Sequence, residues 1–98
     1  MRREIGLLIR EMRLARGIGV NEFGEATGLD SGNYSRFEKG GGGLKLPDSL
    51  YPIARALNTS VPVIFIMLEK VRRDKSILTN SAKLVQIMDR VNEALEKI

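Results

Sequence analysis

The sequence predicts an all-α protein, in which five helices form one domain and a further helix follows at the C-terminal end. Apolar residues recur at helical spacing in six segments, and glycines or helix-capping residues separate these segments. The 98 residues suffice for one hydrophobic core and are too few for two independent cores. We therefore expect a domain over residues 1–73 and an added amphipathic helix over residues 74–98.

The first two helices are predicted over residues 3–16 and 20–27. The first carries an apolar stripe with the i, i+3, i+4, i+7 spacing, formed by Ile5, Leu8, Ile9 and Met12. Gly17 ends this pattern. The second helix begins after Gly19, which is a tolerable N-cap, and it ends at Gly28.

A third helix is predicted over residues 31–39, because Asp30 is a strong N-cap and Gly40 closes the segment. Tyr34 and Phe37 lie three residues apart on one face of this helix, so we expect both in the core.

Two helices follow a run of four glycines, which cannot continue the third helix. Ser49 and Ser60 are the expected N-caps of helices over residues 50–58 and 61–73. The second of these is apolar on more than one side, so it requires more than one packing partner.

The composition excludes most catalytic chemistry. The chain has no Cys and no His, which removes disulfides, the usual zinc ligands, thiol nucleophiles and imidazole bases. We expect a protein that is not an enzyme and binds no metal or cofactor. No apolar run is long enough to span a bilayer and no signal peptide is recognisable, so we expect no membrane contact and a cytoplasmic location.

The net charge of +4 is compatible with nucleic-acid binding, although a modest excess of this kind usually means only a soluble surface. The whole excess lies in residues 1–75, and the remainder of the chain is neutral.

The segment from Val20 to Phe37 carries the most specific pattern. Gly24 lets the next helix approach closely, and Gly28 permits the positive φ of a tight turn. The apolar residues on either side lock two short helices at a steep angle, which is the helix-turn-helix pattern.

Two stretches extend this pattern into a family resemblance. "IREMRLARGIGVNEFGEATGLDSGNYSRFEKG" and "LPDSLYPIARALNTSVPVIF" closely resemble the phage-repressor and Cro type, or Xre-type, helix-turn-helix family of DNA-binding regulators. The resemblance runs from about Ile5 to Leu68 and is most specific in "SRFEKG" and "IARALNTS". It implies a five-helix repressor-like domain whose third helix enters the major groove of duplex DNA.

The resemblance also implies which residues contact DNA. The base-reading residues would be Ser31, Gly32, Asn33, Ser35 and Arg36. Arg36 is the only long donor on that face, so it is the best candidate for a bidentate contact with guanine. For Ser31 and Asn33, helix capping or phosphate contact is an equal alternative, and the start of the helix favours a nearby phosphate.

Further positions follow from the same resemblance. The phosphate-contacting residues would be Lys39, Gly40, Gly41 and Lys45, although the glycines could equally be a flexible connector. Arg13 and Glu38 would form a structural ion pair that orients the third helix. The chain departs from the family at Gly19 and Val20, where a glutamine side chain often holds a phosphate.

A last helix is predicted from Asn80 or Ser81 to Ile98, with an apolar stripe close to heptad spacing. It either folds back on its own chain or pairs with a second chain, and we favour a homodimer that binds an inverted repeat. The expected interface consists of Val63, Ile66, Met67, Leu84, Ile87, Met88, Val91 and Leu95.

We therefore expect a transcriptional regulator, most simply a repressor that occupies an operator. The alternative is a protein-interaction module with the same fold, such as an antitoxin whose C-terminal segment binds a toxin, or a coactivator. In that case a regulatory protein partner is the main ligand.

Overall fold

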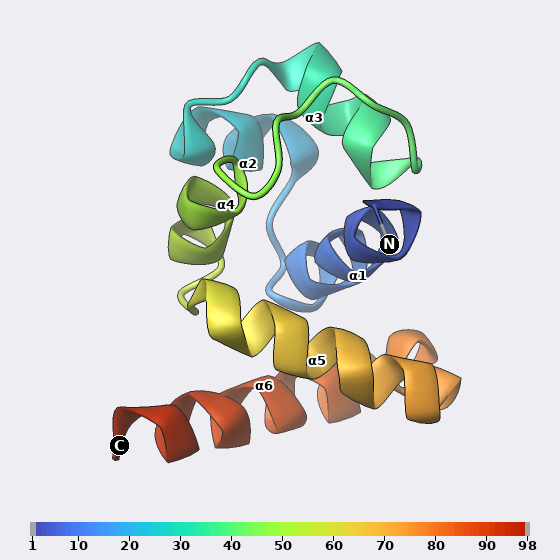
Figure 1. Ribbon diagram of the computed structural model, residues 1–98, viewed down its shortest axis with the longest axis vertical. Coiled ribbons are helices and arrows are strands. Elements are labelled where there is room, and N and C mark those ends of the chain that lie inside the picture. Colours follow the sequence, from blue (N-terminus) through green and yellow to red (C-terminus); the bar gives the residue numbers. More distant parts are fainter. Residues whose placement is uncertain (1, 98) are drawn as a thin grey trace.

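The computed structural model describes residues 2–97 and contains, within that range, six α-helices, one 3-10 helix and no strand (Figure 1). The all-α prediction is confirmed. The elements are α1 (Arg2–Ala15), α2 (Val20–Thr27), α3 (Ser31–Glu38), α4 (Leu50–Ala56), α5 (Val61–Arg73), η1 (Lys75–Thr79) and α6 (Ser81–Glu96).

The predicted helix boundaries differ from these by no more than two residues. The 3-10 helix η1 was not predicted, because a single short turn has no apolar periodicity of its own. Asp74 begins it by accepting a hydrogen bond from the backbone N–H of Ser76, at 3.1 Å.

The helices surround one core to which all six contribute. In Figure 1, α2, α3 and α4 occupy the upper half, and α5 and α6 run side by side across the base. α1 lies between these two groups and contacts α3, α5 and α6. The fully buried side chains include Leu8, Met12, Phe23, Tyr34, Phe37, Ile53, Ile64, Met67 and Met88.

α1 and α3 are in direct backbone contact at Gly6. A Cβ atom at this position would lie 2.1 Å from the carbonyl oxygen of Phe37, so no other residue fits without displacing a helix. The apolar pattern of α1 gave no indication of this role, because a contact between two backbones leaves no periodic signal.

The turn between α2 and α3 has the predicted geometry. Gly28 has φ of 71°, as the tight turn requires. Gly24 faces Ser31, but a Cβ at Gly24 would be 3.7 Å from that of Ser31, an ordinary contact. α3 therefore packs closely at Gly24, yet the space would accept a methyl group.

The predicted N-caps behave differently from one another. Asp30 accepts a hydrogen bond of 2.8 Å from the backbone N–H of Asn33, which confirms it as the cap of α3. Ser49 and Ser60 immediately precede α4 and α5, but neither side chain makes a capping hydrogen bond.

α6 folds back on its own chain, against α1 and α5. Arg16 pairs with Asp89 at 3.0 Å, and the Thr59 hydroxyl donates to Asn92 at 2.7 Å. Four residues predicted for an interface between chains are instead buried inside this one, namely Val63, Met67, Leu84 and Met88. The prediction is corrected for these four, because α6 already covers the extra apolar face of α5.

The other four candidates for that interface are Ile66, Ile87, Val91 and Leu95, which are only partly buried. Within residues 2–97, no single helix is both long and apolar enough to cross a membrane. The pair formed by α4 and α5 is long and apolar enough when the two helices are counted together, but they are bent by 86° relative to each other.

Candidate nucleic-acid interface

α3 divides its residues between the core and the surface. Tyr34, Phe37 and Glu38 are buried, whereas Ser31, Gly32 and Arg36 are exposed. The remaining candidates, Asn33 and Ser35, are partly exposed. The start of α3 therefore presents small side chains to solvent, followed one turn later by the long side chain of Arg36.

Two of the predicted base-reading residues contact each other. The Arg36 guanidinium donates a hydrogen bond to the Asn33 side-chain oxygen. Asn33 also lies against Gly43, where a Cβ would be 3.1 Å from the same oxygen. Arginine carries several N–H donors, so this bond leaves Arg36 able to donate to a further acceptor.

The cap of α3 affects what can bind at the start of this helix. The Asp30 carboxylate already accepts the N–H of Asn33 and places a negative charge there. A phosphate there would meet this carboxylate at close range, which opposes the attraction of the helix N-terminus, and phosphate contact at the start of α3 stays a prediction.

The predicted ion pair between α1 and α3 is present. Arg13 and Glu38 are only 6% and 7% exposed, and two hydrogen bonds of 2.7 and 2.9 Å join their side chains. Arg13 also donates to the carbonyl oxygen of Ile18 at 2.7 Å. The ion pair between Arg13 and Glu38 joins the C-terminal end of α1 to the C-terminal end of α3.

Tyr34 completes this buried network by donating its hydroxyl hydrogen to Glu38. The pKa of Tyr34 is raised far above the ordinary value for tyrosine. Burial is the larger cause, and the hydrogen bond to Glu38 is the second. The hydroxyl therefore remains protonated and keeps donating, while the bond to Glu38 raises the pKa of Arg13. These three side chains fix the orientation of α3 from its buried side.

The glycines after α3 already use their backbone N–H groups. Gly40 donates to the carbonyl of Phe37 at 3.0 Å, and Gly41 donates to that of Arg36 at 2.8 Å. These bonds satisfy carbonyls at the end of α3, so neither N–H is available to a phosphate. The predicted phosphate contacts of Gly40 and Gly41 through the backbone are therefore corrected.

The same loop is anchored to the domain. Leu44 is buried in the core, and the Arg2 side chain donates to its carbonyl oxygen at 2.8 Å. The loop is therefore held to the domain at Leu44, directly after the last glycine. Lys39 and Lys45 are both exposed on either side of this loop, as a phosphate contact requires.

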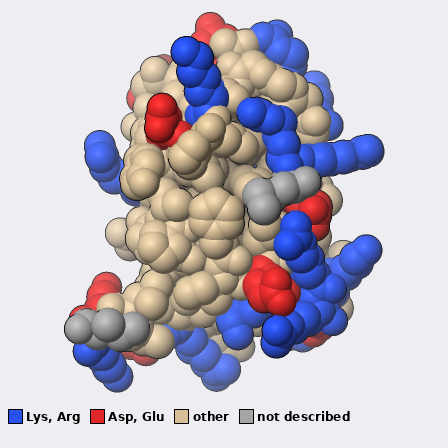
Figure 2. Space-filling view, viewed as in Figure 1, with Lys and Arg blue, Asp and Glu red and all other residues tan. Residues whose placement is uncertain are grey.

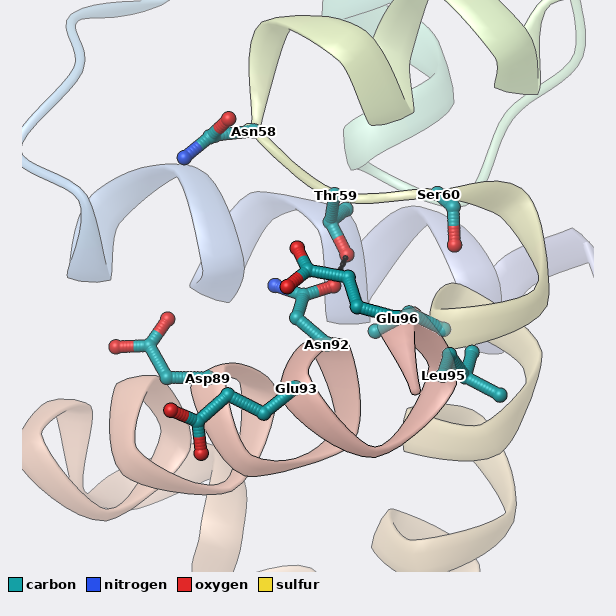
Figure 3. Close-up of a pocket in the computed structure, with 9 residues that line it drawn as sticks. Asn58, Thr59, Ser60, Asp89, Asn92, Glu93, Leu95 and Glu96 are labelled. Atoms are coloured by element: carbon teal, nitrogen blue, oxygen red, sulfur yellow. Dashed lines mark hydrogen bonds between the residues drawn. The ribbon is translucent and has the colours of Figure 1, made fainter. Parts of the chain in front are cut away.

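A second surface lies beside residues 58–60, which connect α4 to α5. A hollow of about 560 Å³ is lined by Asn58, Thr59 and Ser60 and by residues of α6 (Figure 3). Its lining includes the carboxylates of Asp89, Glu93 and Glu96. No pattern in the sequence predicted this hollow, because it joins segments about 30 residues apart that only the folding back of α6 brings together.

Comparisons of the chain with models of protein families, with curated proteins and with solved structures found no match in any of the three. Its function is therefore inferred from its own residues.

Proposed function

We propose that this protein is a sequence-specific regulator of transcription that binds duplex DNA, of the phage-repressor and Cro (Xre) type. In this proposal α2 and α3 form the helix-turn-helix, and α3 enters the major groove. The protein represses by occupying its operator, and no catalytic step, metal or cofactor is involved.

The observation that carries the proposal is the two-sided construction of α3. Its outer side offers small residues and Arg36, and its inner side is fixed by the buried Arg13 and Glu38 pair. Small side chains let the backbone approach base edges, while a fixed inner side holds the reading side chain in one register.

The dimensions of α3 agree with this role. An α-helix with its side chains is about 10–12 Å in diameter, which fits a major groove about 12 Å wide, and the eight residues of α3 form about two turns. Ser35 and Asn33 are only partly exposed, so we expect them at the edge of the contact and expect Arg36 to supply most of the discrimination between bases.

The test is selection of bound duplexes from a random DNA pool, followed by affinity measurements on the selected sequence. Arg36→Ala is expected to cost about 1–3 kcal/mol of discrimination and to relax the preference at one base pair. The fold should be unaffected, because Arg36 is exposed and its side chain hydrogen-bonds to Asn33, which is itself partly exposed.

Thr79→Ala provides the matched control, since Thr79 is exposed and lies in η1, away from α3. If the unaltered protein selects no motif, the proposed function is wrong. If it selects a motif that Arg36→Ala leaves unchanged, the reading role of Arg36 is wrong while DNA binding stands.

We also propose that the regulator acts as a homodimer on an inverted repeat. A two-fold axis would place the two α3 helices about one DNA turn, roughly 34 Å, apart. Because α6 covers much of the originally predicted interface, the surface we now propose is the α4–α5 turn. It is defined by Tyr51, Arg55, Val61, Pro62 and Phe65.

The exposure of two aromatic side chains and the nearby charges support this surface as the dimer interface. Tyr51 is 59% exposed and Phe65 is 39% exposed, although both are large aromatic side chains. Arg55 lines one hollow beside Thr59 and Ser60, and Glu93 and Glu96 line a second hollow beside the same two residues. A two-fold contact in which Arg55 of one protomer faces the acidic hollow of its partner would pair opposite charges.

This surface is separate from the proposed reading face. In Figure 1 the α4–α5 turn lies on the left, below α2, and the exposed residues of α3 are not part of it. Figure 2 shows largely uncharged surface at the centre and left of the same view. A second copy bound there would leave α3 free for DNA.

Phe65→Glu is expected to convert the dimer to a monomer, because it places a carboxylate in the apolar contact. Sedimentation equilibrium measures the change. Leu14→Glu is the matched control, since Leu14 is 45% exposed on α1 and outside the α4–α5 turn. A Phe65→Glu protein that sediments as a dimer would refute this interface.

A second candidate function is the protein-interaction module. One observation favours it, the exposed Val20 at the start of α2, where a donor side chain would otherwise hold a phosphate. Glu22 and Glu25 are also exposed on α2. Absence of a selected DNA motif, together with capture of a protein by the α2 surface, would favour this module over the DNA-binding regulator.

A further inference from the structure

We propose a second phosphate-binding site on α1, in which Arg3 and Arg10 act together with Lys39 to hold the DNA backbone beside the C-terminal end of α3. The inference rests on the proposed function. It assigns a DNA-contacting role to two arginines that lie outside the helix-turn-helix.

The site is a surface hollow of about 370 Å³ between α1 and the end of α3. Its lining residues are Arg3, Leu7, Arg10, Glu38, Lys39 and Gly40. Arg3 and Arg10 are seven residues apart, which places them on the same face of α1, two turns from each other. Both are exposed, as is Lys39.

The side chain of Arg3 packs against Gly40 at this hollow. A Cβ at Gly40 would lie 2.8 Å from the Arg3 Cγ atom, so the arginine stem occupies space that only glycine leaves open. Gly40 also has φ of 88°, which favours glycine. The chain turn after α3 thus presents a surface against which Arg3 packs.

The charges around the hollow leave a positive excess. Glu38 is the one carboxylate in its lining, and the two hydrogen bonds from Arg13 already pair it. Arg10 pairs with Glu11 at 2.8 Å, an exposed contact between neighbours that a phosphate can replace at little cost. The hollow therefore suits an anion.

The C-terminal end of α3 does not strongly repel an anion in this hollow. Helix C-termini carry a negative partial charge on their free carbonyls. Here the N–H groups of Gly40 and Gly41 already bond the carbonyls of Phe37 and Arg36, which reduces that charge.

The position of the hollow relative to the groove identifies the anion. In the proposed docking the first residues of α3 face the base edges, so its C-terminal end lies nearer the edge of the groove, where the phosphates lie. Figure 2 shows Lys and Arg side chains gathered on the right of that view, near the start of α1 and the end of α3 in Figure 1. The expected ligand is a DNA phosphodiester group next to the base pairs read by α3.

The experiment measures affinity for the selected duplex as a function of salt concentration, using the whole chain. Each phosphate contact contributes about 0.9 to the slope of log affinity against log salt. Arg3→Gln combined with Arg10→Gln is expected to reduce that slope by about 2 and to weaken binding at 0.1 M salt by roughly one to two orders of magnitude. The selected base sequence should not change, because phosphate contacts carry no direct sequence information.

Arg90→Gln combined with Lys97→Gln is the matched control. It removes the same charge from exposed residues of α6 and its C-terminal end, away from α3, and should leave the slope nearly unchanged. Arg10→Gln alone should reduce the slope by about 1, and it avoids the contact of Arg3 with Gly40 should the double variant fold poorly.

The outcomes separate the two proposals. Specific binding by the unaltered protein, with the same slope in Arg10→Gln and in a folded double variant, would overturn this site while the proposed function stands. An equal loss of slope in the α6 control would also overturn it, since the effect would then be one of net charge. Absence of any specific binding by the unaltered protein would overturn both proposals.

Discussion

Glu38→Ala is expected to lower the free energy of unfolding by about 3–5 kcal/mol, because Arg13 would keep a buried charge without its partner. The structure leaves Arg13 little alternative. It is 6% exposed, and its remaining hydrogen bond to the carbonyl of Ile18 does not neutralise it. The Tyr34 hydroxyl would lose its acceptor in the same substitution. Urea unfolding followed by circular dichroism measures the change.

Glu69→Ala is the control for this prediction. Glu69 pairs with Arg73 at 3.2 Å, but both side chains are more than half exposed, so water replaces the lost partner and the change should be much smaller. Equal effects of the two substitutions would show that the Arg13 and Glu38 pair is not buried in solution. A double variant, Arg13→Met with Glu38→Leu, should recover much of the lost stability, because it removes both charges together.

Local signals account for what could be predicted from the sequence. Asp30 and Gly28 act within a few residues of their own positions, so their roles as cap and turn could be predicted from composition and spacing. The pairing of Arg13 with Glu38 joins two helices, and the family resemblance supplied it rather than the residues alone.

Contacts between distant segments could not be predicted in the same way. Gly6 touches the backbone of Phe37, and Arg3 packs on Gly40, yet neither contact has a periodic or local signature. The N–H groups of Gly40 and Gly41 illustrate the same limit, because a glycine run is equally consistent with a phosphate cradle and with a helix cap. Only the geometry of the turn distinguishes them.

The apolar stripe of α6 shows a further ambiguity. A stripe close to heptad spacing reports that a helix has an apolar partner, and it does not report whether that partner belongs to the same chain. The decisive fact is that α6 packs against both α1 and α5 of its own chain and buries Leu84 and Met88 in the common core. The preference for pairing between chains gave too little weight to the nearest apolar surface.

Truncation after Lys75 is therefore expected to destabilise the domain severely, rather than to produce a folded monomer. It removes Leu84 and Met88, which are fully buried, and uncovers Val63 and Met67 on α5. Loss of a single buried Leu or Met side chain typically costs about 2–5 kcal/mol, and domains of this size are stable by only about 5–15 kcal/mol. Thermal unfolding followed by circular dichroism should show a broad transition at much lower temperature than that of the whole chain.

Two point variants test whether the lower stability of the truncated chain comes from lost packing rather than from its shorter length. Leu84→Ala and Met88→Ala should each lower the free energy of unfolding by about 2–5 kcal/mol. Gln86→Ala, at an exposed position on the same helix, should have little effect. A truncated chain that unfolds cooperatively at the temperature of the whole protein would contradict the packing of α6 in the core. The stripe of α6 would then be free to pair between chains, because the first five helices would have been shown to form a stable core without it.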